Sequence, residues 1–437
     1  MTQEEVFDVV VVGAGIAGSV CALQLARQGH EVVLLERGAE PGSKNLSGGV
    51  FYCRVMDEVF PDFARVAPVD RRITRNVVSF CNDGSWVNVD YWDSRLADPV
   101  SAVTVRRAVL DAWLVERCEE EGVMVMPGVR VDELVREGDQ VVGVRAGEEE
   151  LRARVVIAAD GVNSFLSRDS GLREREPRNH LAVGVKSVIG LAPATIEERF
   201  HLRDGEGAAY AMVGDVTRGL GGGGFLYTNT ESVSVGVVVR LDALEASGES
   251  SSGLHDHLLS HPLVSSLVEG GELLEYGCHL VAEGGQVMQH DLVRPGLMVI
   301  GDAAGFTLNT GLTVRGMDLA AQSAISAARA AHRALQTGDL SEQAMAGYLE
   351  DYRSTFLGRD MATYSAAPGF LENHRLYDTY GPLLADILHE VYHLDTTPRR
   401  HLVPTAVGVL RRRGPVPRPW PVTSPRRRGH CDPRRTP

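Results

Sequence analysis

The sequence predicts an α/β protein in which a Rossmann-like domain is combined with a second, mainly antiparallel sheet and C-terminal helices. An apolar run at 7–12 leads directly into a glycine-rich turn and a helix, as expected for a parallel strand buried on both faces. Residues 181–240 alternate between apolar and polar positions, which indicates the strands of the second sheet. The pattern over 348–394, broken at Gly381-Pro382, predicts helices that cover the sheet.

Composition and charge describe an ordinary globular protein with an unusual C-terminal end. The 437 residues are 44% hydrophobic and 23% charged, and the net charge of −14 argues against a nucleic-acid-binding protein. Residues 399–437 contain 11 arginines and one acid, Asp432, so this stretch carries +10 and the remainder −24. We expect this stretch to be a disordered basic tail. It is either an arm that binds anionic lipid, or a solvated tail without such a role, or the frame-shifted end of the coding sequence.

The sequence indicates neither a membrane span nor a secretory signal. No apolar stretch reaches the roughly 18–20 residues that a bilayer-spanning helix needs. The first five residues are acidic and lack the positive charge of a signal peptide. The six cysteines are widely spaced, without a C-x-x-C pair, which is typical of reduced thiols and excludes a closely spaced iron–sulfur motif. We expect a cytoplasmic protein, with peripheral contact to the inner face of the membrane as an open alternative.

The first 40 residues contain a dinucleotide-binding motif. Gly13, Gly15 and Gly18 form a G-x-G-x-x-G turn between the strand at 7–12 and a helix. The first glycine permits a tight turn, the second lets the backbone approach a pyrophosphate, and the third allows close helix–strand packing. Glu36 ends a second strand 18 residues after the last of these glycines. A carboxylate at this place accepts hydrogen bonds from an adenosine ribose, which favours FAD or NAD over NADP.

Two later strand-like runs end in an aspartate and a glycine. The run at 151–159 leads into Asp160, and the run at 297–300 leads into Asp302. Ligands of such sheets bind beyond the carboxyl ends of the strands, where an aspartate can hold a ribityl or ribose hydroxyl. The alternative is that both aspartates only cap the helices that follow them.

These three strand ends resemble the flavoprotein family that includes aromatic hydroxylases, geranylgeranyl reductases and electron-transfer-flavoprotein:quinone oxidoreductases. The stretch at 308–318 (Leu-Asn-Thr-Gly, then Val-Arg-Gly-Met-Asp) resembles the FixC type of quinone oxidoreductase, as do 42–52 and 221–229. The Gly-Glu-Gly-Ile motif of geranylgeranyl reductases is absent. The resemblance covers 7–330 and implies a glutathione-reductase-like or aromatic-hydroxylase-like fold that binds one extended FAD, with Asp302 near its ribityl chain.

The resemblance also implies which further residues hold the cofactor. It assigns the FAD phosphates to Arg106, near the start of an amphipathic helix expected over 103–120. An exposed helix charge is the alternative for this arginine. The backbone around Val131 is assigned to the adenine. Arg37, at the end of the second strand, and Lys44, in the loop that follows it, complete the expected cofactor-binding residues.

The loop after the third strand end is expected to tune the flavin. Gly311 and Gly316 would let backbone N–H groups approach a flat ring, and a helix from about Met317 would direct its positive end there. A helix start in this position stabilises negative charge on a reduced flavin and raises its potential. The alternative is a glycine-rich turn that simply begins a helix.

Catalysis is assigned to the flavin itself, and no protein group is a strong catalytic candidate. Arg315 is either a charge near the ring or a surface arginine, and Tyr227 either faces the substrate or is a half-buried strand residue. Cys278 and His279 lie in a strand-like run and are expected to be core residues, with a disulfide or a catalytic cysteine as the alternative. His255, Asp256, His257 and His261 resemble a metal cluster, but positions i and i+2 of a helix, such as His255 and His257, do not face each other, so we expect no metal site.

The domain organisation follows from these assignments. We expect a discontinuous FAD-binding domain at 1–180 and 285–335, and a β-sheet domain on the substrate or quinone side at 181–284. A helical region is expected at 336–398, followed by the basic tail at 399–437.

The resemblance implies electron transfer from a reduced protein carrier to a quinone. The carrier would be an electron-transfer flavoprotein or a ferredoxin-like protein. The sequence shows no Ser-His-Asp or Cys-His signature, which fits a reaction that needs no nucleophile. Membrane contact would be peripheral, and the resemblance places it at 91–104. The alternatives are a soluble FAD-dependent monooxygenase or reductase of a small metabolite, and a flavoprotein subunit that only docks partners.

Overall fold

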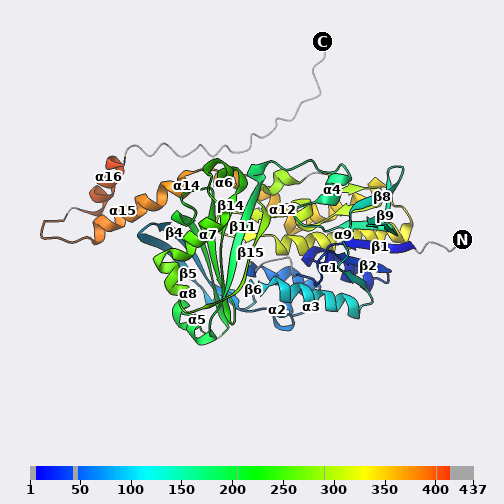
Figure 1. The fold of residues 1–437 in the computed structure, drawn as a ribbon, viewed down its shortest axis with the longest axis horizontal. Helices are drawn as coiled ribbons and strands as arrows, with labels where there is room; N and C mark the ends of the chain where they lie inside the picture. Colours follow the sequence, from blue (N-terminus) through cyan, green and yellow to red (C-terminus); the bar gives the residue numbers. More distant parts are fainter. Residues whose placement is uncertain (1–5, 43–47, 204, 290, 400, 414–437) are drawn as a thin grey trace, which may run out of the picture. The chain divides into compact units, whose positions relative to one another are not determined.

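The computed structural model of the protein describes residues 6–42, 48–203, 205–289, 291–399 and 401–413 (Figure 1). The fold divides into two units, the first ending at Gly381 and the second beginning at Pro382. In the described part of the chain, the first unit contains two large sheets and a two-stranded ribbon, β18 (Leu308–Asn309) with β19 (Val314–Arg315).

The first sheet is mainly parallel and has the strand order β16-β17-β10-β1-β2-β7. β16 pairs antiparallel with β17, and the hairpin β8–β9 adds to β10 in the same way. The strands are β1 (Val6–Val12), β2 (Val32–Glu36), β7 (Met124–Pro127), β8 (Glu133–Glu137), β9 (Gln140–Ala146), β10 (Glu149–Ala158), β16 (Val293–Arg294) and β17 (Leu297–Val299).

The register of the central strands explains why the nucleotide motif works as a unit. Residues 9–12 of β1 are buried valines that pair in parallel with 32–35 of β2 and 155–158 of β10. Parallel strands in this register end at one edge of the sheet, so Glu36 and Asp160 follow at the same edge as the glycine turn. The Rossmann-like part of the prediction is therefore confirmed.

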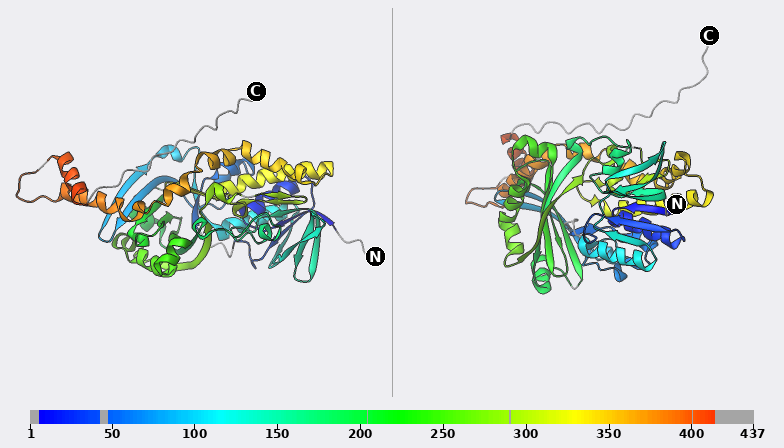
Figure 2. Two further views of the ribbon diagram at one scale, coloured as in Figure 1. Left: turned by 90° about the horizontal axis from the view of Figure 1, so that it is seen from above. Right: turned by 45° about the vertical axis from the view of Figure 1, so that its right-hand side comes forward.

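Helix α1 packs on β1 and β2 and is flanked by α3 and α9 (Figures 1 and 2). The buried side of α9 consists largely of alanines, whose small side chains let the two helices approach closely. α10, α11 and α12 in turn pack on α9. The helices of this part are α1 (Ile16–Arg27), α2 (Phe63–Val66), α3 (Arg107–Glu120), α4 (Phe165–Asp169), α9 (Met317–Thr337), α10 (Glu342–Met345), α11 (Gly347–Ser354) and α12 (Phe356–Thr363).

The second sheet is mainly antiparallel, as predicted, with the order β15-β11-β14-β13-β12-β4-β6-β3 and β5 beside β4. Its one large parallel pair joins β12 and β4. α7 packs on β11 and β14. The elements are β3 (Gly48–Phe51), β4 (Arg72–Asn82), β5 (Ser85–Trp92), β6 (Val103–Arg106), β11 (Leu181–Gly190), β12 (Glu206–Gly214), β13 (Gly222–Thr228), β14 (Ser232–Arg240), β15 (Glu272–Ala282), α5 (Pro193–Phe200), α6 (Leu241–Ser247), α7 (Ser251–Ser260), α8 (Pro262–Val268), α13 (Ala367–Leu371) and α14 (Arg375–Asp378).

Two features of this sheet differ from the sequence-based expectation. β3, β4, β5 and β6, all within residues 48–106, belong to the second sheet, although the sequence pattern assigns 1–180 to the FAD-binding domain. The sequence does not reveal this excursion because strands of either sheet show similar patterns. The helix expected over 103–120 begins only at Arg107, since 103–106 pair with β3 as strand β6. The β-branched residues Val103, Thr104 and Val105 favour the extended chain there.

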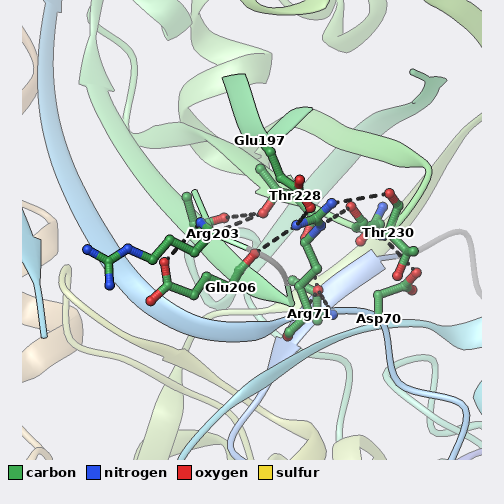
Figure 3. A network of polar contacts seen from close by, with 10 residues as sticks. Asp70, Arg71, Glu197, Arg203, Glu206, Thr228 and Thr230 are labelled. Carbon is green, nitrogen blue, oxygen red and sulfur yellow. Dashed lines mark hydrogen bonds and ion pairs between the residues drawn. The ribbon is translucent and has the colours of Figure 1, made fainter. Parts of the chain in front are cut away.

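A buried arginine ties the second sheet to the chain segments that reach it (Figure 3). Arg71 precedes β4, and its side chain is 3% exposed. Its guanidinium contacts the Glu197 carboxylate at 3.1 Å and donates to three backbone carbonyls, those of Glu206 at 3.0 Å, Asn229 at 2.8 Å and Thr230 at 3.4 Å. Because one side chain satisfies acceptors from three separate segments, it fixes their relative positions.

Replacing Arg71 by methionine is expected to lower the free energy of unfolding by about 3 kcal/mol. Methionine preserves much of the volume but leaves the Glu197 carboxylate and the three carbonyls without their donor. Urea unfolding followed by circular dichroism measures the loss. Arg95→Met is the control, because the Arg95 side chain is 85% exposed and should leave the midpoint unchanged. An equal effect of the two variants would contradict this account.

The second unit contains most of α15 (Tyr380–Tyr392) and α16 (Leu402–Arg412). The expected interruption of the helices lies just before Gly381-Pro382, between α14, which ends at Asp378, and α15, which begins at Tyr380. Gly381-Pro382 itself lies in the first turn of α15, where a proline needs no hydrogen-bonded N–H. The expected disorder of the tail is wrong for α16. Arg412 donates to Glu390 of α15 at 2.6 Å, and such pairs supply partners that the tail sequence alone does not reveal. Residues 414–437 lie outside the described residues.

Candidate functional site

A cavity of about 1000 Å³ lies in the first unit, between the carboxyl edge of the first sheet and one face of the second sheet. Its size is at the upper end of the range that is usual for ligand sites. The glycine motif and Glu36 line one part of it, and Val78 of β4, Ala211 of β12 and Phe225 of β13 line another. Both sheets therefore contribute to one continuous binding site.

The three motif positions require glycine for different structural reasons. Gly13 has φ +104°, and a Cβ atom there would lie 2.4 Å from the carbonyl oxygen of Ala159. A Cβ atom on Gly18 would lie 1.8 Å from the carbonyl oxygen of Gly13. A Cβ atom on Gly15 would approach only the guanidinium of Arg107, at 3.3 Å, and Gly15 lines the cavity. Packing therefore requires the first and third glycines, whereas the second leaves room for a ligand.

Glu36 is held in place by the backbone at the end of β2. The Ala14 amide donates to Oε2 of Glu36 at 3.0 Å, and the Gly38 amide donates to Oε1 at 2.6 Å. Each carboxylate oxygen has further lone pairs, and the side chain lines the cavity. The geometry suits a ribose diol, which donates hydrogen bonds to such a carboxylate.

The structure describes two of the three other residues that were expected to contact the cofactor near this end of the cavity. Arg37 and Val131 both line the cavity, and their roles as cofactor contacts stay predictions. Lys44 lies outside the described residues.

Asp160 combines the two interpretations that the sequence left open. Its Oδ2 accepts the Leu166 amide of α4 at 3.0 Å, so the side chain does cap a helix. Its Oδ1 is buried and has no hydrogen-bond partner among the described residues, and the side chain lines the cavity. Burial raises the pKa of this carboxyl group. An unpaired buried oxygen at a cavity wall is costly, which points to a ligand donor as its partner.

Asp302 lies in the turn after β17 and lines the cavity, as predicted. Burial raises its pKa, and the nearby Arg107 and His279 lower it by a smaller amount. Sequence reasoning missed both neighbours as site residues. His279 lines the cavity from β15, so the expectation that it packs in the core does not hold. The same expectation is wrong for Cys278, which is an exposed free thiol because β15 is an edge strand.

Arg107 lines the cavity, whereas Arg106 does not. Arg107 forms a two-pronged ion pair with Asp111, at 2.8 Å and 2.7 Å, and its guanidinium lies beside Gly15. The Arg106 side chain is 44% exposed and pairs with Asp70 at 3.2 Å. Arg106 therefore points away from the cavity wall that Arg107 forms, because β6 continues to Arg106 and the helix begins only at Arg107, and its contact with the FAD phosphates stays a prediction.

The loop at 308–316 reaches the cavity as expected. Gly311 and Gly316 both line it, and α9 begins at Met317, directly after Gly316. The N–H of Gly311 already donates to the Asn309 side chain at 2.9 Å, so this glycine shapes the loop, with φ +81°. The start of α9 is the part of this loop whose dipole favours negative charge in the cavity.

Arg315 and Tyr227, the two weak catalytic candidates, both line the cavity. Arg315 is paired with Asp318 at 2.6 Å and with Asp360 at 2.6 Å, so its charge is compensated by two carboxylates. Tyr227 stacks on Phe225 with ring centroids 5.1 Å apart, and burial raises its pKa. Both arrangements favour a role in shaping the cavity wall. Among the described residues, no group of histidine, cysteine and acidic side chains is arranged to bind a metal.

Comparison with known proteins places the chain in a family. A family model described as FAD dependent oxidoreductase matches residues 8–166. The probable electron transfer flavoprotein-quinone oxidoreductase YdiS of Escherichia coli (strain K12) is 43% identical over 413 residues, which are 94% of this chain and 96% of that protein. Protein FixC of Salmonella typhi is 41% identical over 394 residues, 90% of this chain and 92% of that protein. The chain belongs to the FixC-type electron-transfer-flavoprotein:quinone oxidoreductase family.

Solved structures agree with this family's fold. A geranylgeranyl bacteriochlorophyll reductase-like protein from Thermoplasma acidophilum matches with a TM-score of 0.68 and 21% identity, covering 94% of this chain and 97% of that one. A myxobacterial chondrochloren halogenase matches with a TM-score of 0.62 and 20% identity, covering 89% and 90%. At these identities the likeness shows the fold alone.

This FixC-type protein is an FAD-dependent oxidoreductase, and its cavity fits the cofactor. A bare backbone at Gly15, the carboxylate of Glu36 and the unpaired oxygen of Asp160 provide the space and the acceptors that an adenine dinucleotide needs. Within the described residues, no helix has the length and apolar character required to cross a bilayer.

The part of the cavity formed by the second sheet is mostly apolar and contains few titratable groups. Besides the apolar strand residues, its lining includes Tyr227 of β13, Arg240 of β14, His279 of β15, Tyr377 of α14 and Glu283, just after β15. Arg240 is paired with Asp242 at 2.9 Å. A wall of this kind can hold a flat, uncharged molecule and offers a small number of hydrogen bonds.

Proposed function

We propose that this FixC-type oxidoreductase accepts electrons from a reduced protein carrier, an electron-transfer flavoprotein or a ferredoxin-like protein, and passes them to a quinone. The observation that carries the proposal is the 43% identity, over nearly the full length of both chains, to a relative named as a probable electron transfer flavoprotein-quinone oxidoreductase. Bound FAD supplies a group that takes up and releases one or two electrons.

The residues of this chain would bind and orient the cofactor. Glu36 would accept hydrogen bonds from the ribose, and Arg107, beside Gly15, would contact the pyrophosphate. Asp302 would hold the ribityl chain. The start of α9, after Gly316, would stabilise negative charge at the ring.

The mouth of the cavity suits a quinone with an apolar tail. Leu312, Val314 and Phe370 line the cavity and yet are 72%, 54% and 56% exposed. Exposed apolar side chains at the rim of a binding site favour contact with an apolar ligand or surface. Peripheral membrane contact at 91–104 stays a prediction, supported by the exposure of Tyr91 and Trp92 at 49% and 46%.

The proposal is tested by mixing the reduced, FAD-loaded protein with the soluble quinone menadione in a stopped-flow spectrometer. We expect the reduced-flavin spectrum to be lost within a single turnover, and the oxidised protein to be reduced by a reduced electron-transfer flavoprotein or ferredoxin. NADPH should not reduce it. Rapid NADPH oxidation in air, stimulated by an aromatic compound, would instead identify a soluble monooxygenase and overturn the proposal.

Replacing Leu312 by glutamate is expected to raise the KM for a long-tailed quinone about tenfold, because a charge at the rim removes apolar contact area. The KM for menadione, which has no tail, should change little. Leu263→Glu is the control, since Leu263 is 46% exposed on α8 and does not line the cavity. Equal KM values for Leu312→Glu and the control would show that the quinone tail does not pass this rim.

A further inference from the structure

Glu283 is a carboxyl group on the cavity wall that the proposed function has not used. It follows β15 directly, is half-buried and lines the cavity. Its Oε2 accepts a hydrogen bond from Nδ2 of Asn309 at 3.2 Å. Its backbone N–H donates to the carbonyl of His180 at 2.8 Å. The side chain is therefore held between β15 and the loop that leads to α9.

The charged and titratable groups around Glu283 leave it able to carry a proton. The carboxyl group is desolvated by burial, which raises its pKa, while Asn309 and the more distant Arg240 lower the pKa by smaller amounts. Arg240 is itself paired with Asp242. On α14, burial raises the pKa of Tyr377 to about 12, and its hydroxyl donates to the carbonyl of Leu371 at 2.7 Å.

The other ionisable groups on this wall are less suited to deliver a proton. Arg240 does not release a proton at neutral pH. The Tyr377 hydroxyl is already committed to a backbone carbonyl. His279 has its Nδ1 against the carbonyl of Leu280 and lies near Asp302, so it belongs to the cofactor side of the site. Glu176, which pairs with the ring of His180 and with Arg173, does not line the cavity.

We propose that Glu283 is a catalytic acid that donates a proton to a quinone oxygen in the cavity. This inference rests on the proposed function and names a residue that acts on its acceptor. Conversion of a quinone to a quinol adds two electrons and two protons. Reduced flavin, when bound, would supply both electrons and one proton, and the second proton would come from the Glu283 carboxyl group. A proton from bulk water then restores the acid.

The Glu283→Gln variant separates a chemical role from a structural one. The amide oxygen of the new side chain would still accept the hydrogen bond from Asn309, so the loop should keep its place. The amide cannot donate a proton to a reacting oxygen, although it can donate a hydrogen bond to a bound quinone at every pH. A merely structural Glu283 would tolerate this replacement without kinetic consequence.

The first measurement is the Kd of menadione for the oxidised, FAD-loaded protein from pH 5 to pH 9, followed by flavin fluorescence. A protonated Glu283 donates to the quinone carbonyl and a carboxylate repels it, so we expect the Kd to rise about tenfold as pH increases through the raised pKa. Glu283→Gln should bind with nearly constant Kd over this range. Glu272→Gln, at an exposed position on β15, the strand that precedes Glu283, should keep the pH dependence of the unmodified protein.

The second measurement is the rate at which menadione oxidises the reduced protein in a single turnover at saturating quinone. We expect Glu283→Gln to slow this step about 100-fold, which is within the usual contribution of a general acid. An unchanged rate together with a Kd that still varies with pH would overturn the role of Glu283. Absence of menadione binding to the unmodified, FAD-loaded protein at every pH would instead overturn the proposed quinone reaction itself.

Discussion

Replacement of Gly15 by leucine is expected to give a folded protein that no longer retains FAD. The backbone of Gly15 has ordinary extended angles, and a side chain there would project past Arg107 into the cavity rather than into the core. The space it would occupy is where the motif brings the backbone to the pyrophosphate. The steric overlap would cost about 3 kcal/mol of binding free energy and so weaken FAD binding about 100-fold. The absorbance ratio of flavin to protein after gel filtration measures how much FAD is retained.

Gly18→Ala serves as the contrasting variant. A Cβ atom there would lie 1.8 Å from the carbonyl oxygen of Gly13, so the turn itself cannot form without a shift of backbone. We expect this variant to lose thermal stability in the absence of FAD as well as in its presence. Gly15→Leu should keep the melting temperature of the FAD-free protein. If Gly15→Leu retained a full complement of flavin, the placement of the cofactor in this cavity would be wrong.

The nucleotide-binding part of the site was predictable because its signal is local. The strand, the glycine turn, the helix and Glu36 lie within 30 consecutive residues, and each has a direct physical reason in the sequence. Asp160 and Asp302 were also found, because each directly ends an apolar run that parallel pairing carries to the same edge. These positions depend on secondary structure and on the sheet register, both of which the sequence expresses clearly.

The remainder of the site depends on contacts between distant segments, which leave no local pattern. His279 lies on the edge strand β15, and Glu283 directly follows that strand. One side of β15 becomes part of the cavity wall only when the strand pairs with β11. The choice between Arg106 and Arg107 has a different origin, since the adjacent arginines lie across a strand–helix boundary and a shift of one residue changes which of them faces the cavity. The tail helix α16 was missed because its charged partners lie on α15, an element that precedes it in the chain.

The boundary between β6 and α3 allows the contributions of Arg106 and Arg107 to FAD binding to be compared directly. Arg107→Ala is expected to weaken FAD binding about 30-fold, because a charge-assisted hydrogen bond to the pyrophosphate contributes about 2 kcal/mol. Arg106→Ala should leave the Kd for FAD nearly unchanged, since that side chain is 44% exposed and paired with Asp70. Titration of the FAD-free protein with FAD, followed by flavin fluorescence, gives both values. The opposite ranking of the two variants would restore the assignment made from the sequence.

Loss of Arg107 also has a consequence for stability that must be separated from loss of the ligand contact. The Asp111 side chain is fully buried, and Arg107→Ala removes the arginine that compensates its charge. The single variant should therefore unfold at a lower urea concentration, with a loss of about 3 kcal/mol in the free energy of unfolding. A double variant, Arg107→Met with Asp111→Leu, removes both charges and should regain most of that stability. Because it still lacks the guanidinium beside Gly15, its affinity for FAD should stay low, which distinguishes a direct contact with the cofactor from a general weakening of the fold.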